Sequence, residues 1–312
     1  MRISITATDA GARLDKLIVQ KVPGLGRAAA KRLFAEGKVK ILPGGDGRPR
    51  HASKGDVASP DDVIELALEP AESAGAAVPD RDAPLHIALE TPHFIIADKP
   101  AGQPTAPLDP GERGTLANAL VGRYPELAEV GFSPREPGLC HRLDTGTSGL
   151  VLAARTKPAF VALTAALKEG RLDKRYLVLC AAADLPESGS IDIPLAPHPK
   201  DRRRVYPCVH PRDVARYAPR PASTAYTVQR VHGDIAVVEV RAPKAARHQI
   251  RAHFSAIDHP LLGDVLYGGP PIAGAEGRHA LHAYRIAWEG DASIPAFAVE
   301  SPLPPDLAAL LT

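Results

Sequence analysis

The chain has 312 residues, of which 45% are hydrophobic and 24% charged, as is usual for a soluble globular protein of about two domains. Its three cysteines, Cys140, Cys180 and Cys208, have no paired spacing, which argues against a disulfide framework or a zinc ribbon. The N-terminus lacks the apolar core of a signal peptide, and no apolar run approaches the about 20 residues that span a membrane. We therefore expect a cytoplasmic protein with no membrane partner.

The charge is unevenly distributed, although the net charge is only +2. Residues 1–60 contain 12 Lys and Arg but only five Asp and Glu. Two smaller basic clusters follow, one at Arg202–Arg204 and one spread over residues 241–251. A single cluster of this kind is more often a solvated helix face. Three clusters in one chain favour a nucleic acid as the partner.

Two short helices followed by strands are predicted in the first part of the chain. Apolar residues recur at helical spacing over residues 12–19, and a second helix is predicted over residues 27–36. Short apolar runs at residues 39–41 and 63–66 predict strands.

This order resembles the small αL RNA-binding fold of the ribosomal small-subunit protein S-four type. The motifs that carry the resemblance are Arg13-Leu14-Asp15, Gly37-Lys38-Val39 and Asp62-Val63-Ile64. The resemblance implies that the second helix contacts RNA through Arg27, Lys31 and Arg32.

Residues 70–84 are small, contain several prolines and show no periodicity, as is typical of a linker. We therefore expect an RNA-binding domain at residues 1–72, a linker at 73–84 and a second domain at 85–312.

More strands than helices are predicted in the second domain. Strand patterns cover residues 94–97, 149–154, 172–179, 223–231, 234–240 and 281–288. Helical patterns cover residues 116–124, the segment between Pro158 and Gly170, and residues 247–257 and 306–311. Several strands follow one another without an intervening helix. This arrangement predicts an α+β fold with a mixed, largely antiparallel sheet flanked by helices.

Residues 138–149 combine polar groups with a tight turn before a buried strand. Asp144 lies in this turn, among glycine and hydroxyl residues, and His141 and Arg142 precede it. A plainer interpretation is a polar loop in which Asp144 caps a turn. The chain has no phosphate-binding loop, no dinucleotide-binding glycine motif and no HExxH, and its histidines are scattered. We therefore expect no cofactor and no metal.

Asp144, Tyr176 and Arg251 can carry out covalent and proton-transfer chemistry without a cofactor. An aspartate attacks as the ionised group, which a neighbouring arginine favours. A tyrosine offers a flat ring for packing and a hydroxyl for proton transfer. Each residue also has a plainer interpretation, since a tyrosine on an apolar strand is more often core and an arginine on a helix more often lies at the surface.

The sequence of residues 141–149, His-Arg-Leu-Asp-x-x-Thr-Ser-Gly, resembles the signature of the pseudouridine synthases that modify large-subunit ribosomal RNA and tRNA. Further motifs of this family follow in order: Asp98-Lys99-Pro100-Ala101-Gly102, Lys174-Arg175-Tyr176, His248-Gln249-Ile250-Arg251, Gly263-Asp264, Tyr267-Gly268, Leu281-His282-Ala283 and Ser301-Pro302-Leu303-Pro304. Several ordered motifs are far more specific than any one of them. The resemblance covers roughly residues 85–312.

The resemblance implies an RNA-uridine isomerase and a role for each catalytic candidate. Asp144 would attack the uridine, at C1′ of the sugar or at C6 of the ring. Tyr176 would pack beside the target base and take the C5 proton. Arg251 would pair with the aspartate.

The same resemblance implies RNA contacts around the target base. Arg142 would occupy the space that the base leaves in the RNA, with His141 beside it, and Ile250 would form an apolar wall of the pocket. One motif departs from the family: Thr-Gly-Arg usually precedes His-Gln, whereas Ala245-Ala246-Arg247 stands here.

Two other interpretations remain open. A synthase of the related small-subunit class typically has Gly-Arg-Leu-Asp, and His141 argues against it. An RNA-binding or ribosome-assembly factor on the same fold would have no need to retain all three catalytic candidates. Nothing in the sequence requires more than a monomer.

Overall fold

The structure is a computed structural model that describes residues 1–22, 25, 27–45, 47–67 and 75–312, without the side chains of residues 27–29 and 32. Contacts divide the chain into two compact units, one of residues 1–83 and 106–137 and one of residues 84–105 and 138–312. Each unit contains a hydrophobic core of its own.

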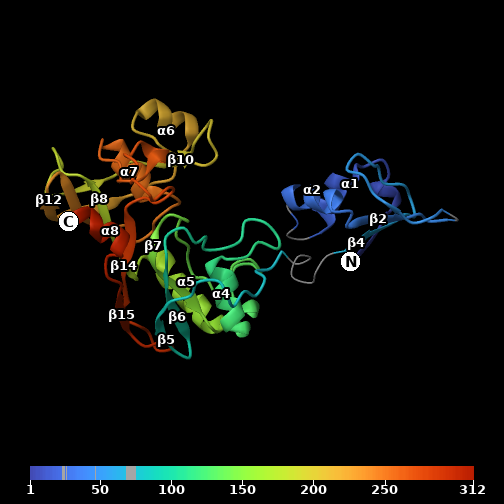
Figure 1. Cartoon of the computed structure of the whole chain (residues 1–312), viewed down its shortest axis with the longest axis horizontal. Coiled ribbons are helices and arrows are strands. Elements are labelled where there is room, and N and C mark those ends of the chain that lie inside the picture. The colour runs from blue at the N-terminus through green and yellow to red at the C-terminus, as the bar shows by residue number, and fades with distance from the viewer. Residues whose placement is uncertain (23–24, 26, 46, 68–74) are drawn as a thin grey trace. The chain divides into compact units, whose positions relative to one another are not determined.

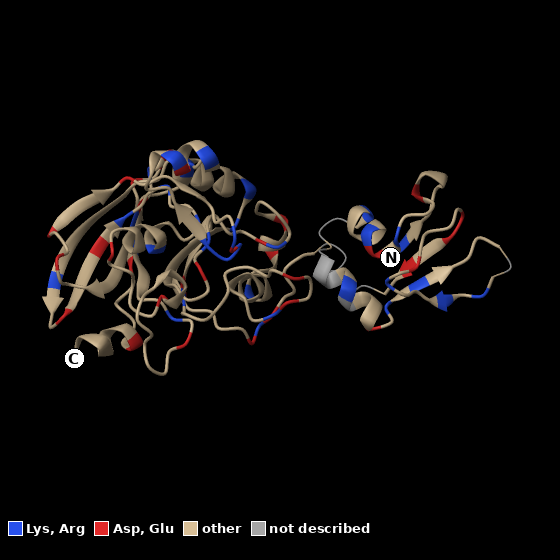
Figure 2. Cartoon of the chain, turned by 90° about the horizontal axis from the view of Figure 1, so that it is seen from above, with Lys and Arg blue, Asp and Glu red and all other residues tan. Residues whose placement is uncertain are grey.

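The first unit is built on a small antiparallel sheet with the strand order β1-β4-β2-β3. Its elements are β1 (Arg2–Ser4), η1 (Ala7–Asp9), α1 (Leu14–Lys21), α2 (Arg27–Ala35), β2 (Val39–Leu42), β3 (Arg50–His51), β4 (Val63–Leu66), α4 (Leu116–Arg123) and η2 (Pro125–Glu129). Leu14 and Ile18 of α1 share one buried cluster with Ile41 and Ile64 of the sheet. Lys and Arg recur in this unit (Figure 2). The two predicted helices and the strands at 39–41 and 63–66 are present, whereas β1 and β3 are too short to show a period in the sequence.

Residues 106–137 join the first unit through hydrogen bonds with the chain before residue 84. The N–H of Ala77 donates to the carbonyl of Pro134 at 2.9 Å, and Nδ2 of Asn118 donates to the carbonyl of Val78 at 2.7 Å. The division expected from the sequence, 1–72, 73–84 and 85–312, differs from the contact-based units in that it places this segment in the second domain.

The second unit is organised around a nine-stranded sheet (Figure 1). Its strands are β5 (Ile87–Glu90), β6 (Phe94–Lys99), β7 (Ser148–Ala154), β8 (Asp173–Ala181), β9 (Ser188–Ile191), β12 (Thr224–His232), β13 (Ile235–Arg241), β14 (Leu281–Trp288) and β15 (Phe297–Glu300). Their order is β5-β6-β7-β14-β8-β13-β12-β9, and β15 pairs with the second half of β14. Only the β7–β14 pair is parallel among the strands that the structure describes. The predicted α+β fold with a mixed, largely antiparallel sheet is confirmed.

Helices and a small hairpin surround this sheet. They are α5 (Lys157–Glu169), the β10 (Leu195–Pro197) and β11 (Val205–Pro207) hairpin, α6 (Pro211–Tyr217), α7 (Gln249–Ala256), η3 (Val265–Tyr267), α8 (Pro305–Ala308) and η4 (Ala309–Leu311). The left-handed conformation of Gly170, with φ 80°, ends α5 as the sequence predicts. Helix α7 contacts β11, β12 and η3. It therefore lies between the sheet and the β10–β11 hairpin.

Gly149 allows β7 and β14 to lie side by side. Its φ is 114°, and a Cβ at this position would come within 2.3 Å of the carbonyl oxygen of Ala283. A larger residue would push the two strands apart. The pairing of β14 with both β7 and β8 brings the loop that enters β7 close to β8.

Candidate active site

Asp144 lies in the loop that enters β7, and the strand backbone holds this loop. The N–H of Cys140 donates to the carbonyl of Leu152 at 3.0 Å, and the N–H of Leu152 donates to Nε2 of His141 at 3.2 Å. The carbonyl of Asp144 accepts the N–H of Thr147 at 3.0 Å, which closes a turn. The Asp144 side chain is 24% exposed, so its carboxylate is accessible to a substrate.

The segment that follows β6 binds the backbone on both sides of Asp144. Oγ1 of Thr105 donates to the carbonyl of Leu143 at 2.6 Å and lies 3.2 Å from its N–H. On the other side, Nζ of Lys99 donates to the carbonyl of Thr145 at 3.3 Å. We call Lys99 and Thr105 the β6 clamp. Because both neighbours of Asp144 are held, the position of its carboxylate is fixed by the fold.

The Lys99 ammonium group is fully buried and is satisfied by backbone carbonyls. Besides Thr145, it donates to Pro100 at 2.9 Å and to Gln103 at 2.8 Å. Burial, followed by the charge of Arg278, lowers the pKa of Lys99 to about 7. Asp144 acts in the opposite direction.

A second buried cation holds the end of the Asp144 loop. Nη1 of Arg278 donates to the carbonyl of Gly146 at 2.8 Å, and Nη2 donates to Oγ of Ser148 at 3.0 Å. Oγ1 of Thr147 lies 2.7 Å from Nε2 of His279. Burial is the main cause that lowers the pKa of His279 to about 2, so the ring is neutral near pH 7. Thr147 and Ser148 of the Thr-Ser-Gly motif thus fix the Asp144 loop through their side-chain contacts.

Arg251 binds two carboxylates at once. Its Nη1 donates to Oδ2 of Asp144 at 2.9 Å, while Nε and Nη2 donate to the two oxygens of Asp264 at 2.6 and 2.8 Å. Arg251 and Asp264 are both buried. Burial would lower the pKa of Arg251, but the hydrogen bonds and charge of Asp264, followed by those of Asp144, raise it above its ordinary value. The two-pronged pair with Asp264 aims the remaining nitrogen of Arg251 at Asp144.

His248 forms a second polar neighbour of Asp144. It begins α7 in the left-handed conformation, with φ 54°, and its Nε2 lies 3.6 Å from Oδ1 of Asp144. Its Nδ1 lies 3.1 Å from the Tyr267 hydroxyl, which accepts the N–H of Val205 at 2.8 Å. Because the Tyr267 oxygen already accepts this hydrogen bond, we assign the Tyr267 hydroxyl as the donor to Nδ1 of His248. The proton of the neutral His248 ring is then on Nε2, the nitrogen that faces Asp144. Burial lowers the pKa of His248 to about 4 against the pull of Asp144, so the ring is neutral near pH 7.

Tyr176 and Ile250 form an apolar wall beside this polar group. Both are buried and belong to one core cluster, against which Leu143 packs. Tyr176 comes from β8 and Ile250 from α7, while Leu143 directly precedes Asp144. Within the described residues, no hydrogen bond joins Tyr176 to Asp144 or Arg251. The structure therefore brings Asp144 and Arg251 into contact and places Tyr176 in the neighbouring wall.

The residues expected to contact RNA differ in their surroundings. Arg142 is exposed, whereas His141 is half-buried and accepts a hydrogen bond from β7. Burial lowers the pKa of His141 to about 3. Lys31 is exposed on α2, and the side chains of Arg27 and Arg32 lie outside the described part of the chain.

Arg247, which stands where the family motif is altered, contacts the protein itself. Its Nη2 donates to the carbonyls of Arg202 and Arg203 at 3.0 and 2.6 Å. It thereby ties the basic turn of the β10–β11 hairpin to the start of α7. Arg204 of the same turn lies over the ring of Tyr267, with 5.2 Å from its Cζ to the ring centroid.

Asp264, His248, Tyr267 and Lys99 have no individual site role in the sequence-based prediction. All four fall within the motifs that carry the family resemblance. Which group each of them binds depends on contacts between segments far apart in the chain, and sequence spacing does not show these contacts.

The residues that the structure describes contain neither a candidate metal site nor a candidate membrane span. No three His, Cys, Asp or Glu side chains come together there as a metal site. None of the helices described has the length and apolar character needed to cross a membrane.

Comparison with known proteins shows what the chain is similar to. A family model described as RNA pseudouridylate synthase matches residues 93–256. An uncharacterized RNA pseudouridine synthase of Chloroflexus aurantiacus is 33% identical over 99% of this chain and 92% of its own length. Ribosomal large subunit pseudouridine synthase D of Haemophilus ducreyi is 32% identical over 98% of this chain and 92% of its own. The solved structure of human RNA Pseudouridylate Synthase Domain Containing 1 shares the fold, with a TM-score of 0.54 and 24% identity over 74% of this chain and 89% of that chain.

Proposed function

Because the chain belongs to the RNA pseudouridylate synthase family and is an isomerase acting on RNA uridine, we propose that its substrate is large-subunit ribosomal RNA and that Asp144 attacks the uridine. We propose large-subunit ribosomal RNA because several relatives of this chain are named ribosomal large subunit pseudouridine synthase D.

The observation that carries the role of Asp144 is its ion pair with Arg251. The pair joins a partly exposed carboxylate to a buried guanidinium group at 2.9 Å. A nucleophile needs access to the substrate and a fixed direction. The partial exposure of Asp144 gives access, and Arg251 together with the β6 clamp fixes the direction of the carboxylate.

The reaction is an isomerisation in which no atom is gained or lost overall. The bond between N1 of uracil and C1′ of the ribose breaks, the base turns, and a bond forms between C5 and C1′. Asp144 forms a bond to C1′ or to C6, and this bond breaks again before the product is released. The hydrogen at C5 leaves as a proton, for which Tyr176 is the proposed carrier, and N1 takes up a proton, so the composition is unchanged. The target base leaves its stack at a cost of a few kcal/mol, and Arg142 is the proposed occupant of the gap.

A tritium-release assay tests this proposal. Large-subunit ribosomal RNA labelled at uridine C5 should release tritium with the wild-type protein and show no release with Asp144→Asn. Because the amide is nearly isosteric with the carboxylate, RNA affinity should stay within about twofold. Turnover by Asp144→Asn at the wild-type rate would refute the role of Asp144. RNA binding without any release by the wild type would instead indicate a non-catalytic RNA-binding factor.

Mapping of pseudouridines identifies the RNA. We expect at least one site in large-subunit ribosomal RNA to disappear from cells that lack this gene. Loss of sites in tRNA alone would assign the enzyme to tRNA. We also expect a cytoplasmic monomer, which cell fractionation and light scattering check.

A further inference from the structure

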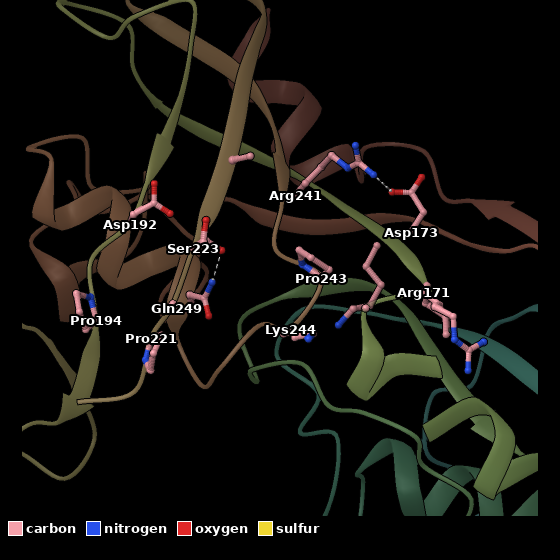
Figure 3. A pocket seen from close by; sticks show the side chains of 15 residues that line it. Arg171, Asp173, Asp192, Pro194, Pro221, Ser223, Arg241, Pro243, Lys244 and Gln249 are labelled. Carbon is pink, nitrogen blue, oxygen red and sulfur yellow. Dashed lines mark hydrogen bonds and ion pairs between the residues drawn. The ribbon is translucent and has the colours of Figure 1, made fainter. Parts of the chain in front are cut away.

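A pocket of about 760 Å³ lies in the second unit beside the candidate active site. Pockets of about 300–1,000 Å³ bury small ligands in proteins. Its walls are formed by the segment before and at the start of β8, the end of β13, and the loops next to β9 and β12. Arg171, Asp192, Ser223, Arg241, Lys244 and Gln249 are among the lining residues (Figure 3). Lys174 lines the pocket as well.

Two elements connect this pocket with the candidate active site. On β8, Lys174 lines the pocket and lies two residues before Tyr176, so that both side chains project from the same face about 7 Å apart. The charge of Lys174 also reaches the Asp144 loop, because after burial it is the next cause that lowers the pKa of His141. On α7, Gln249 lines the pocket and directly precedes Ile250. An RNA strand placed at Asp144 would therefore pass this pocket.

The pocket has a cationic side. The Arg241 guanidinium group pairs at 3.1 Å with Asp173, a carboxylate that also pairs with Arg175 and Arg285, and Arg171 pairs with Glu169. Lys174 and Lys244 differ, since no ion pair joins either ammonium group to a carboxylate among the residues that the structure describes. Two lysines without such partners leave positive charge for a ligand.

The opposite side of the pocket offers hydrogen-bond acceptors and hydroxyl groups. Asp192 and Ser223 lie across the pocket from Arg241 and Lys244 (Figure 3). The hydroxyl groups of Ser223 and Ser190 lower the pKa of Asp192 and keep it ionised. A ligand that fits both sides is negative at one end and carries N–H or O–H donors at the other. A nucleotide within an RNA strand has this character.

We propose that the pocket holds a nucleotide of the substrate RNA that flanks the target uridine. Its phosphate lies between Lys174 and Lys244, and its ribose or base donates to Asp192. Lysine ammonium groups bind phosphate oxygens as point charges, and a carboxylate accepts from a ribose hydroxyl or a base amino group. This inference rests on the proposed function, since it takes RNA as the ligand.

The test compares Lys174→Ala, Lys244→Ala and the double variant with Lys157→Ala, which removes an exposed lysine of α5 outside the pocket. RNA affinity is measured over a series of salt concentrations with a large-subunit ribosomal RNA fragment. Each phosphate contact contributes about 0.7 to 0.9 to the slope of log K against log salt. We expect the double variant, which loses the one phosphate contact, to lower the slope by about this amount and to raise KM for RNA about tenfold or more, and each single variant to lower the slope by less. Lys157→Ala should match the wild type.

A charge-preserving pair separates phosphate binding from a folding defect. Lys174→Arg combined with Lys244→Arg should keep the wild-type slope, because an arginine also binds phosphate. If the double alanine variant keeps the wild-type slope and the wild type forms pseudouridine, the pocket assignment is wrong and the proposed function stands. Failure of the wild type to form pseudouridine would instead refute the proposed function.

Discussion

Arg251 contacts Asp144 at 2.9 Å with one nitrogen, while its other two nitrogens are held by a carboxylate that no solvent reaches. The ion pair at the site is thus the exposed end of a longer chain of charges. Asp264 fixes Arg251, and Arg251 fixes Asp144. The direction of the Asp144 carboxylate therefore depends on Asp264, a buried residue.

Arg251→Lys should lower the single-turnover rate about 100-fold or more with little change in RNA affinity. A lysine keeps the charge but has no planar fork, so it cannot bind both oxygens of Asp264 and still reach Asp144. Tritium release under single-turnover conditions measures the loss. Arg285→Lys is the matched control, because Arg285 pairs with the exposed Glu300 on the sheet. Equal losses in the two variants would contradict the role of Arg251.

Tyr176→Phe should lower turnover about 100-fold or more and leave RNA affinity within about twofold. The change removes only the hydroxyl, so the packing of the wall is kept, while proton transfer by a positioned side chain contributes about 10²- to 10⁴-fold. Tyr226→Phe is the control, since Tyr226 is a buried tyrosine of the same core cluster. Wild-type turnover by Tyr176→Phe would show that its hydroxyl has no part in the reaction.

Lys99→Met should alter how stability depends on pH. The folded protein has a pKa of about 7 at Lys99, below the ordinary 10.5, so between these values the unfolded chain holds a proton that the folded chain has lost. Wild-type stability should therefore gain up to about 1.4 kcal/mol per pH unit as pH rises from 7, relative to Lys99→Met. Urea unfolding at pH 7.5, 8.5 and 9.5 measures this difference. Parallel profiles of the two proteins would contradict it.

The half-buried His141 and His248 should make the stability of the protein sensitive to acid. Burial lowers the pKa of His141 to about 3 and that of His248 to about 4, below the ordinary 6.5. The unfolded chain therefore binds more protons as pH falls below 6.5, and each histidine removes up to about 1.4 kcal/mol of stability per pH unit. Urea unfolding between pH 7 and pH 4.5 should show a shallower slope for His141→Gln than for wild type. His232→Gln, at an exposed site of the β12–β13 hairpin, should keep the wild-type slope.

Lys31→Ala should weaken RNA binding and lower its salt slope by about 0.7 to 0.9, as expected when one phosphate contact is lost. Lys31 is exposed on α2, where we propose that Arg27 and Arg32 also face the RNA. Lys54→Ala is the control, because Lys54 is an exposed lysine of the same unit outside the proposed RNA-binding helix. Identical slopes in wild type and Lys31→Ala would argue against this part of the interface.

Elements with a clear hydrophobic period were predictable from the sequence. The β12–β13 hairpin and its turn at Gly233, the buried β7 and the helix ending at Gly170 are all found. The region from β9 to α6 was not predicted, because its strands have three or four residues and follow proline- and arginine-rich segments. Such short strands form because they pair with strands distant in the sequence, and they are too short to show an alternation of apolar and polar residues.

The pairing of Asp144 with Arg251 was predictable from the sequence, but the residues that hold this pair in place were not. Asp144 and Arg251 were expected to meet, and the structure joins them across 107 residues of sequence. The sequence gives no sign that Asp264 takes two nitrogens of Arg251, since which carboxylate a buried arginine binds is decided by tertiary packing. The RNA contacts of Arg142 and His141 stay predictions.

The β6 clamp has a consequence for how the enzyme and the RNA adapt to each other. Thr105 and Lys99 hold the backbone on both sides of Asp144 through hydrogen bonds within the protein. The Asp144 carboxylate, the proposed attacking group, therefore has little freedom to change its position. The adjustment that brings the reacting atoms together falls on the RNA, so uridines in loops or weakly stacked positions should be the ones that this rigid aspartate can reach.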